Sequence, residues 1–383
     1  MQDFREELRS AAPQPLKPPD VQAIWRGGLR RRWTQLALAA LSMVVIGTGV
    51  WTLVEGEYIS EFFDRGGVQP ADDEGVVSTG PTGKVVLWGV EPPEGPEQSW
   101  TVVDLESGES RSFERPEFSV GDAKYKLEYI GDKFVFAGSD GRTAGTYALD
   151  TNLRGDPVLL GGHSWSFFPS AADGRVWLDL RNRGSSTLRG GVAEVTVDGE
   201  VTLQQSDPPP NGIIGAVNQG LLIQGSGLQV WDPRTDRIVW RMDGVFPVDA
   251  HKDVVAWCDR DCPELNLTNL STGQDTVIVP PEGLRFEGTD DGAFSPDGDM
   301  LAVPVQAEDG RRVAIVDVPN ATVRVVPESH LNVGYGLLTW TSSADWLLFY
   351  GGNGALGAYN PKSGQSKFTH LETSMGFIAM AAN

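Results

Sequence analysis

Residues 291–327 read DGAFSPDGDMLAVPVQAEDGRRVAIVDVPNATVRVVP, and this stretch decides the fold. A leading run, DGAFS, is followed by three runs rich in apolar and β-branched residues, MLAVPV, RVAIVDVPN and TVRVVP. Turn-forming Gly, Pro, Asn and Asp residues separate the runs. Short runs bounded in this way are typical of antiparallel strands. The stretch therefore predicts one four-stranded unit.

The most apolar run of this unit recurs along the chain. It occurs as KVVLWGV at 84, KFVFAG at 133, RVWLDLR at 175, GLLIQG at 220, DVVAWC at 253, MLAVPV at 300 and WLLFYG at 346. Each run precedes a strand that ends in a turn, and these turns are marked by Gly108, Asn152, Gly199, Asp236, Gly273, Asn320 and Gly364. Their spacing of 37 to 47 residues is the period of propeller blades. We therefore expect an all-β fold, a seven-bladed β-propeller of four-stranded antiparallel blades over residues 84–383.

The first unit has no leading strand, whereas the chain ends with GFIAMAAN after the last outer strand. We expect residues 377–382 to supply the missing inner strand of blade 1, because this closes the ring and protects the strand edges.

Aspartate recurs in the turn between the first and second strands of five units, at Asp132, Asp173, Asp253, Asp297 and Asp345. Such residues form turns, and the alternative is calcium binding.

The segment AFSPDGDMLAVPV, with Phe294, Ser295, Pro296, Asp297 and Gly298, resembles the bacterial WD40-like propeller repeat of TolB-type proteins. The resemblance is sharp in this repeat and degraded in the other six. It implies a fold rather than a function.

Residues 33–54, WTQLALAALSMVVIGTGVWTLV, carry no charge and are long enough for a helix that crosses one bilayer. Basic residues come before this segment and acidic ones follow it: Arg26, Arg30, Arg31 and Arg32, then Glu55, Glu57, Glu61 and Asp64. The positive-inside rule then predicts a cytoplasmic N-terminus and an outward propeller. The alternatives are a cleaved signal peptide and a buried core helix. Residues 55–83 are expected to form an extracytoplasmic linker with a reach of about 30 Å.

Residues 1–32 form a short, proline-rich cytoplasmic tail, either a flank that sets the topology or a linear recognition element. The stretch DVQAIWRGGLRRRW before an apolar helix is similar to the leader of single-pass proteins from high-GC bacteria, some of them beside extracytoplasmic-function sigma factors. Anti-sigma factors of that kind often bind zinc in this leader through one His and two Cys. Residues 1–32 contain neither residue type.

The charge of the chain excludes some partners. Residues 1–32 carry a net charge of +3, and residues 55–383 carry 24 basic and 48 acidic side chains, a net charge of −24. The outer part should repel nucleic acids and anionic lipids. We expect no nucleic-acid partner.

The two cysteines, Cys258 and Cys262, lie in WCDRDCPE on the connection between the second and third strands of blade 5. In an oxidising compartment this spacing favours a local disulfide, with two free thiols as the alternative. Zinc needs more ligands than this stretch provides.

The chain has four histidines, and His163 and His330 lie on loops that enter inner strands. They are either ligand-binding or locally bonded loop residues.

One face of the propeller should carry the longer and more varied connections. Arginines gather on this face, at Arg181, Arg183, Arg189, Arg260, Arg311 and Arg312. Two aromatic residues, Trp165 and Tyr335, also lie there and either stack on a ligand or pack in the core. Either these arginines bind an anionic partner, or they pair with neighbouring acids such as Asp259, Asp261, Glu308 and Asp309.

No nucleophile elbow, P-loop, zinc-protease or dinucleotide-binding motif occurs in a fitting context. We therefore expect no catalytic residue, metal or cofactor. The sequence favours a non-catalytic binding, sensing or protein-interaction module in the cell membrane, with a protein or an anionic envelope ligand as partner. The alternatives are an envelope hydrolase or lyase with its site in the central cleft, and a sigma-factor-linked transmembrane regulator.

Overall fold

The computed structural model describes residues 80–90, 98–114, 127–139, 143–153, 155–162, 164, 166–180, 191–206, 212–288, 292–327, 329, 338–350, 355–370 and 376–383. The chain divides into two units, Met1–Gly56 and Glu57–Asn383, and all described residues belong to the second. The tail 1–32 and the expected membrane segment 33–54 lie outside them. Among the residues described, no helix has the length and apolarity needed to cross a membrane.

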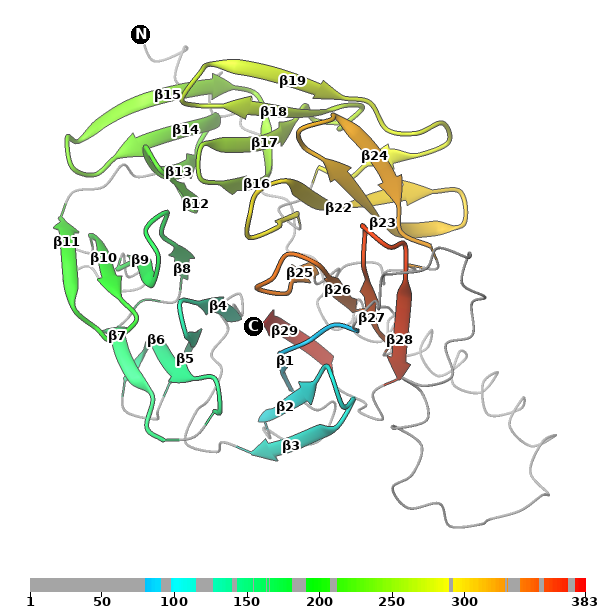
Figure 1. Cartoon of the computed structure of the whole chain (residues 1–383). Helices are drawn as coiled ribbons and strands as arrows, with labels where there is room; N and C mark the ends of the chain where they lie inside the picture. Colours follow the sequence, from blue (N-terminus) through cyan, green and yellow to red (C-terminus); the bar gives the residue numbers. More distant parts are fainter. Residues whose placement is uncertain are drawn as a thin grey trace, which may run out of the picture. The chain divides into compact units, whose positions relative to one another are not determined.

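In these residues, seven antiparallel sheets surround a common centre (Figure 1). The prediction of a seven-bladed, all-β propeller is confirmed. From the centre outward, blade 2 contains β4 (Leu127–Ile130), β5 (Lys133–Ser139), β6 (Ala144–Asp150) and β7 (Val158–Gly162). Blade 3 contains β8 (Ser166–Pro169), β9 (Arg175–Asp179), β10 (Val192–Thr196) and β11 (Val201–Gln205). Blade 4 contains β12 (Gly212–Val217), β13 (Gly220–Gln224), β14 (Gly227–Asp232) and β15 (Arg237–Asp243).

Blades 5 to 7 follow the same order, except that the inner strand of blade 6 is in two pieces. Blade 5 contains β16 (Phe246–His251), β17 (Val254–Cys258), β18 (Leu265–Asn269) and β19 (Gln274–Ile278). In blade 6, β20 (Arg285–Phe286) and β21 (Ala293–Phe294) form the inner strand, and β22 (Met300–Ala307), β23 (Gly310–Asp317) and β24 (Thr322–Val325) follow. Blade 7 contains β25 (Leu338–Trp340), β26 (Leu347–Tyr350), β27 (Ala355–Tyr359) and β28 (Ser366–His370).

Blade 1 joins the two ends of the propeller sequence. Its order is β29 (Gly376–Ala382), β1 (Lys84–Val90), β2 (Gln98–Asp104) and β3 (Ser110–Glu114). The backbone N–H of Lys84 donates to Oδ1 of Asn383 over 2.6 Å, and the N–H of Asn383 donates to the carbonyl of Lys84 over 3.1 Å. The predicted closure of the ring by the C-terminal strand is confirmed.

The core lies between blades. The apolar runs form the second strands, which are covered on both faces, so both odd and even positions are apolar. In β5, Phe134 and Phe136 pack toward blade 1, whereas Val135 and Ala137 pack toward blade 3. The buried apolar residues that the structure describes form one cluster at each of the seven blade interfaces.

The propeller has two faces that differ in their connections. The turn face carries the turns from first to second strands and those from third to fourth strands. The described turns of the first kind are residues 131–132, 170–174, 218–219, 252–253, 295–299 and 341–346. Those of the second kind are residues 105–109, 151–153 with 155–157, 197–200, 233–236, 270–273, 318–321 and 360–365. The loop face carries the connections from second to third strands and from each blade to the next. Its described connections include residues 225–226, 244–245, 259–264, 279–284 and 308–309.

Side chains that accept backbone hydrogen bonds shape the turn face. Asx-type bonds of this kind occur at Asp104, Asp232, Asn269, Asp317 and Asn360, near the end of the third strand of five blades. All seven of these turns reach a positive φ, at Gly108, Leu153, Gly199, Asp236, Gly273, Ala321 and Gly364. In blades 2 and 6 the positive φ thus falls one residue after the marker that the sequence suggested.

Asp297 forms the turn bond expected of it, because its carboxylate accepts from Ser295 Oγ (2.6 Å) and from the N–H of Asp299 (3.1 Å). Asp253 and Asp345 instead accept from the side chains of Gln219 and Lys362. Among the described residues, no group of three or more His, Cys, Asp or Glu side chains is arranged to hold a metal ion.

Polar bonds on the turn face also join neighbouring blades. Glu194 of β10 is only 2% exposed, and its carboxylate contacts a partner in the next blade and three in its own. These are Arg234 (3.7 Å) in blade 4, and Ser170 Oγ (2.6 Å), Thr202 Oγ1 (2.9 Å) and Arg175 (3.5 Å) in blade 3. The charge is buried but fully surrounded by donors, which is the condition under which a buried carboxylate is tolerated.

Candidate functional site

The best described part of the loop face lies where blades 5 and 6 meet. We call it the blade 5–6 corner and define it as residues 259–264, 287–288 and 308–312. It contains Arg260 and Arg312 of the predicted binding residues and borders Cys258. The other predicted binding residues lie outside the described residues: Arg183, Arg189, Trp165, Tyr335, His163 and His330.

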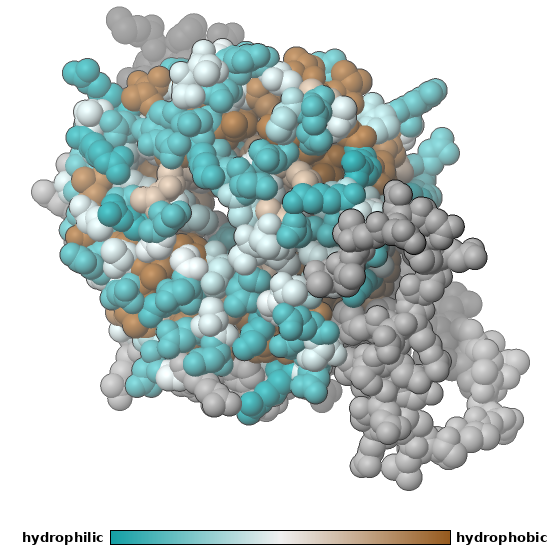
Figure 2. Space-filling view, viewed as in Figure 1, coloured by the Kyte–Doolittle hydropathy of each residue, from teal (hydrophilic) through white to brown (hydrophobic). Residues whose placement is uncertain are grey.

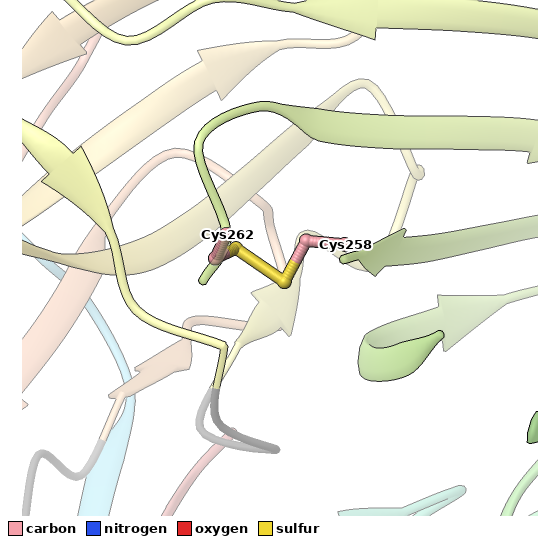
Figure 3. The surroundings of a disulfide bond; sticks show 2 residues. All are labelled: Cys258 and Cys262. Carbon is pink, nitrogen blue, oxygen red and sulfur yellow. A yellow bond between two sulfur atoms is a disulfide. The ribbon is translucent and has the colours of Figure 1, made fainter. Parts of the chain in front are cut away.

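A disulfide joins Cys258, the last residue of β17, to Cys262 in the connection that leads to β18 (Figure 3). The predicted disulfide is confirmed. Both cysteines are buried, with exposed fractions of 0% for Cys258 and 1% for Cys262. They belong to the core cluster between blades 5 and 6, together with Phe286 and Val305 of blade 6.

A glycine of the next blade lies close to the disulfide. A Cβ atom on Gly288, which follows β20, would lie 3.2 Å from Sγ of Cys258 and 3.5 Å from Cβ of Cys262. A side chain there would press on the bridge, so glycine permits the close approach of the two blades. The bridge therefore fixes the base of the connection 259–264, while Asp259, Arg260 and Asp261 remain exposed above it.

Two arginines of the corner are paired with acids. Arg311 is 5% exposed, and its guanidinium donates to the carboxylate of Glu287, which follows β20. Arg312 donates to Asp309 at the tip of the hairpin between β22 and β23. These contacts favour pairing with neighbouring acids, one of the two roles that the sequence left open for these residues. Arg260 is exposed, and the structure gives it no ion pair within the part of the chain that it describes.

A backbone hydrogen bond to Pro304 holds the chain at Glu287 against β22. Pro304 lies within β22, and its carbonyl accepts from the N–H of Glu287 on the side of the inner strand. In an antiparallel strand the N and O atoms of a residue point to the same side, so the missing N–H of Pro304 also faces the inner strand. The inner strand is interrupted here, between β20, which pairs at Val305, and β21, which pairs at Leu301 and Ala302.

Sequence reasoning missed Glu287, Gly288 and Pro304 as determinants of this corner. One signal was present: proline in the middle of the apolar run MLAVPV predicts an irregularity in the sheet. The contact between Gly288 and the disulfide has no local signal, because it depends on how two blades approach each other.

The visible surface around the propeller is mostly hydrophilic, and hydrophobic groups reach it in separate patches (Figure 2). The exposed large apolar side chains in the described residues lie mainly on outer strands or just beside them: Leu159, Val201, Ile238, Val239, Phe246, Val277 and Val279. The described part of the corner presents charged side chains instead.

No protein-family model matches the chain, and no curated protein matches it by sequence. Solved structures match at the level of fold. They include TolB from Acinetobacter baumannii (10% identity, TM-score 0.47) and a protein from Lactobacillus plantarum (10% identity, TM-score 0.48). The first match covers 78% of this chain and 66% of the TolB chain, and the second covers 79% and 100%. A chain of a nidogen/laminin complex is similar at 9% identity and a TM-score of 0.41, over 78% of this chain and 98% of that one.

Proposed function

We propose that this chain is a single-pass protein of the cell membrane whose propeller lies outside the cytoplasm and acts as a non-catalytic protein-binding module. The charge-free segment 33–54, with basic residues before it and acidic residues after it, supports the anchor and its orientation. The ring of blades supplies a rigid support for surface residues.

The observation that carries the binding role is the construction of the blade 5–6 corner. A buried disulfide of blade 5 lies at the base of the exposed charged connection 259–264, and Gly288 of blade 6 packs against it. The Arg311–Glu287 pair lies within blade 6, and Glu287 is the residue before Gly288. A connection held in this way loses little conformational freedom when it binds, so more of its contact energy appears as affinity.

The charges of the corner favour a protein partner over an anionic ligand. Arg311 and Arg312 are already neutralised by Glu287 and Asp309. In the exposed connection, Arg260 stands among three acids, Asp259, Asp261 and Glu264. A partner surface with basic side chains and an acceptor for Arg260 fits this arrangement.

Site-specific photo-crosslinking in intact cells tests the binding role. A photoreactive residue at position 260 of the full chain should crosslink to a defined protein, and the yield should fall as salt rises because the contact is electrostatic. The same residue in place of Glu106, which is exposed on the turn face, is the matched control. Equal crosslinking patterns at the two positions would show that the corner is not the binding surface.

Reporter fusions test the anchor and its orientation separately. A reporter that is active only outside the cytoplasm should give a signal when it is fused after Asn383. A signal from a cytoplasm-specific reporter alone would reverse the proposed orientation.

A further inference from the structure

His251 ends the inner strand of blade 5 and packs against blade 6. Its ring centroid lies 6.0 Å from that of Phe294 in β21. A Cβ atom on Gly298, in the turn that follows β21, would lie 2.8 Å from Cδ2 of His251. The imidazole therefore fills the space that the absent side chain of Gly298 leaves. Its Nε2 atom is buried and has no hydrogen-bond partner among the described residues.

The strand that His251 contacts is held by three blades. β21 has two residues and pairs only with Leu301 and Ala302 of its own sheet. The N–H of Phe294 donates to Oδ2 of Asp249 in blade 5 over 2.7 Å, and Trp340 Nε1 of blade 7 donates to the carbonyl of Ala293 over 2.8 Å. So short a strand depends on these contacts from its neighbours, and the His251 contact is one of them.

We propose that His251 is an acid-sensitive latch: its neutral imidazole holds β21 against blade 5, and protonation of the imidazole loosens this strand. The neutral ring fits a site where Nε2 meets no acceptor. The imidazolium carries an N–H on both nitrogens and a charge, and both require an acceptor or water. Water reaches Nε2 only if the ring moves away from Phe294 and Gly298.

The groups around His251 agree with this proposal. Burial, with the positive charge of Lys252 in the same turn, lowers the pKa of His251 below its ordinary value, and the negative charge of Asp297 opposes the shift. Burial raises the pKa of Asp297, but hydrogen bonds from Ser295 and from the N–H of Asp299 outweigh this and lower the pKa overall. Asp297 therefore stays ionised while His251 titrates.

Three further acidic groups that the structure describes in this region, Asp249, Asp253 and Asp345, have hydrogen-bond partners. The Asp249 carboxylate accepts from the N–H groups of Phe294 and Ala250, and Asp253 accepts from Gln219 of blade 4. From blade 7, Lys362 pairs with Asp345, and its positive charge also acts on Asp297.

The sign of the pH dependence follows from the lowered pKa. An unfolded chain protonates histidine near pH 6.5, whereas folded His251 protonates at lower pH. The unfolded state therefore binds more protons in this window. The contribution of His251 to stability is complete above about pH 6.5 and falls as the pH drops through the folded pKa. One such group changes the folding constant by at most about tenfold per pH unit.

Amide hydrogen exchange of the full-length chain between pH 8 and pH 5, corrected for intrinsic rates, tests the latch. Peptides that contain Phe294 should lose protection below about pH 6.5, and peptides from β5 in blade 2 should not. His251→Gln should remove this acid step. A triple variant of the other histidines, His163→Gln, His330→Gln and His370→Gln, should keep it.

An acid step that persists in His251→Gln, or that disappears in the triple variant, would overturn the proposal. If His251→Gln does not fold, deuterium uptake at the imidazole carbon of His251 in the wild-type chain gives its titration directly. A midpoint at or above the ordinary histidine value, or a titration without a change in Phe294 protection, would likewise rule out the latch.

Discussion

The two faces of the propeller are built in different ways. On the turn face, short turns are closed by carboxylate and amide side chains, and polar contacts such as Lys133 to Asp198 (3.1 Å) join one blade to the next. On the loop face, the connections differ in length and sequence, and the described corner is stabilised by a disulfide and two ion pairs. The difference indicates that the described residues of the turn face mainly maintain the ring, whereas the described residues of the corner hold one charged connection in place. Partner binding by the loop face stays a proposal.

The largest effect should come from breaking the ring itself. Deleting residues 376–383 removes β29, its pairing with β1 and the buried side chains Met380, Ala381 and Ala382. We expect the free energy of unfolding to fall by at least about 4 kcal/mol, and the melting temperature by about 10 °C or more. Deleting Asn383 alone is the control and should cost about 2 kcal/mol, because Lys84 loses both of its hydrogen bonds with Asn383. Equal melting curves for the two deletions would contradict ring closure.

The second largest effect should come from the buried carboxylate of the turn face. Glu194→Ala leaves two hydroxyl groups and two guanidinium groups without their shared acceptor, so we expect a loss of about 3 kcal/mol in chemical denaturation. Asp243→Ala removes an exposed ion pair with Arg241 and should cost less than about 0.5 kcal/mol. Similar losses for the two variants would show that the Glu194 contacts do not join blades 3 and 4.

The sequence predicted this fold because each blade repeats local signals. The run KFVFAG predicts a strand covered on both faces, and the structure buries Phe134 and Val135 on opposite sides of it. Such signals need no knowledge of the neighbouring blades. The C-terminal strand was predictable for the same reason, since one blade lacked a strand and the chain had one left.

The details of the candidate site were less predictable, because they depend on contacts between blades. The spacing of Cys258 and Cys262 predicted a disulfide, but the burial of the bridge comes from its packing against residues of blade 6, such as Phe286 and Val305. His251 looks like an ordinary turn residue until the ring places it over Gly298. The binding roles of Arg183, Tyr335 and the other loop residues outside the described part of the chain stay predictions.

A smaller effect is expected from the disulfide on the loop face. The double variant Cys258→Ala and Cys262→Ala releases a ring of five residues, which on chain entropy alone should cost about 2 kcal/mol. Faster hydrogen exchange should be confined to residues 259–264 and to the neighbouring part of blade 6. Intact mass measured after alkylation without a reductant should show no label on the wild-type chain. Stoichiometric labelling of both cysteines would contradict the bridge.

The smallest effect on stability should come from Arg260, and here the two faces can be compared directly. Arg260→Glu changes an exposed side chain to which the structure gives no ion pair in the described residues, so the free energy of unfolding should change by less than about 0.5 kcal/mol. Arg234→Glu on the turn face, with the same change of charge, places an acid beside buried Glu194 and should cost more. The same two variants compare the faces in binding, with a photoreactive residue in place of Asp261 as the crosslinking probe. If the loop face binds the partner, the crosslinking yield should fall in Arg260→Glu and persist in Arg234→Glu, with the second variant measured below its melting temperature. The reverse result would assign partner binding to the turn face, because the charge at Arg234 would then matter for binding and the charge at Arg260 would not.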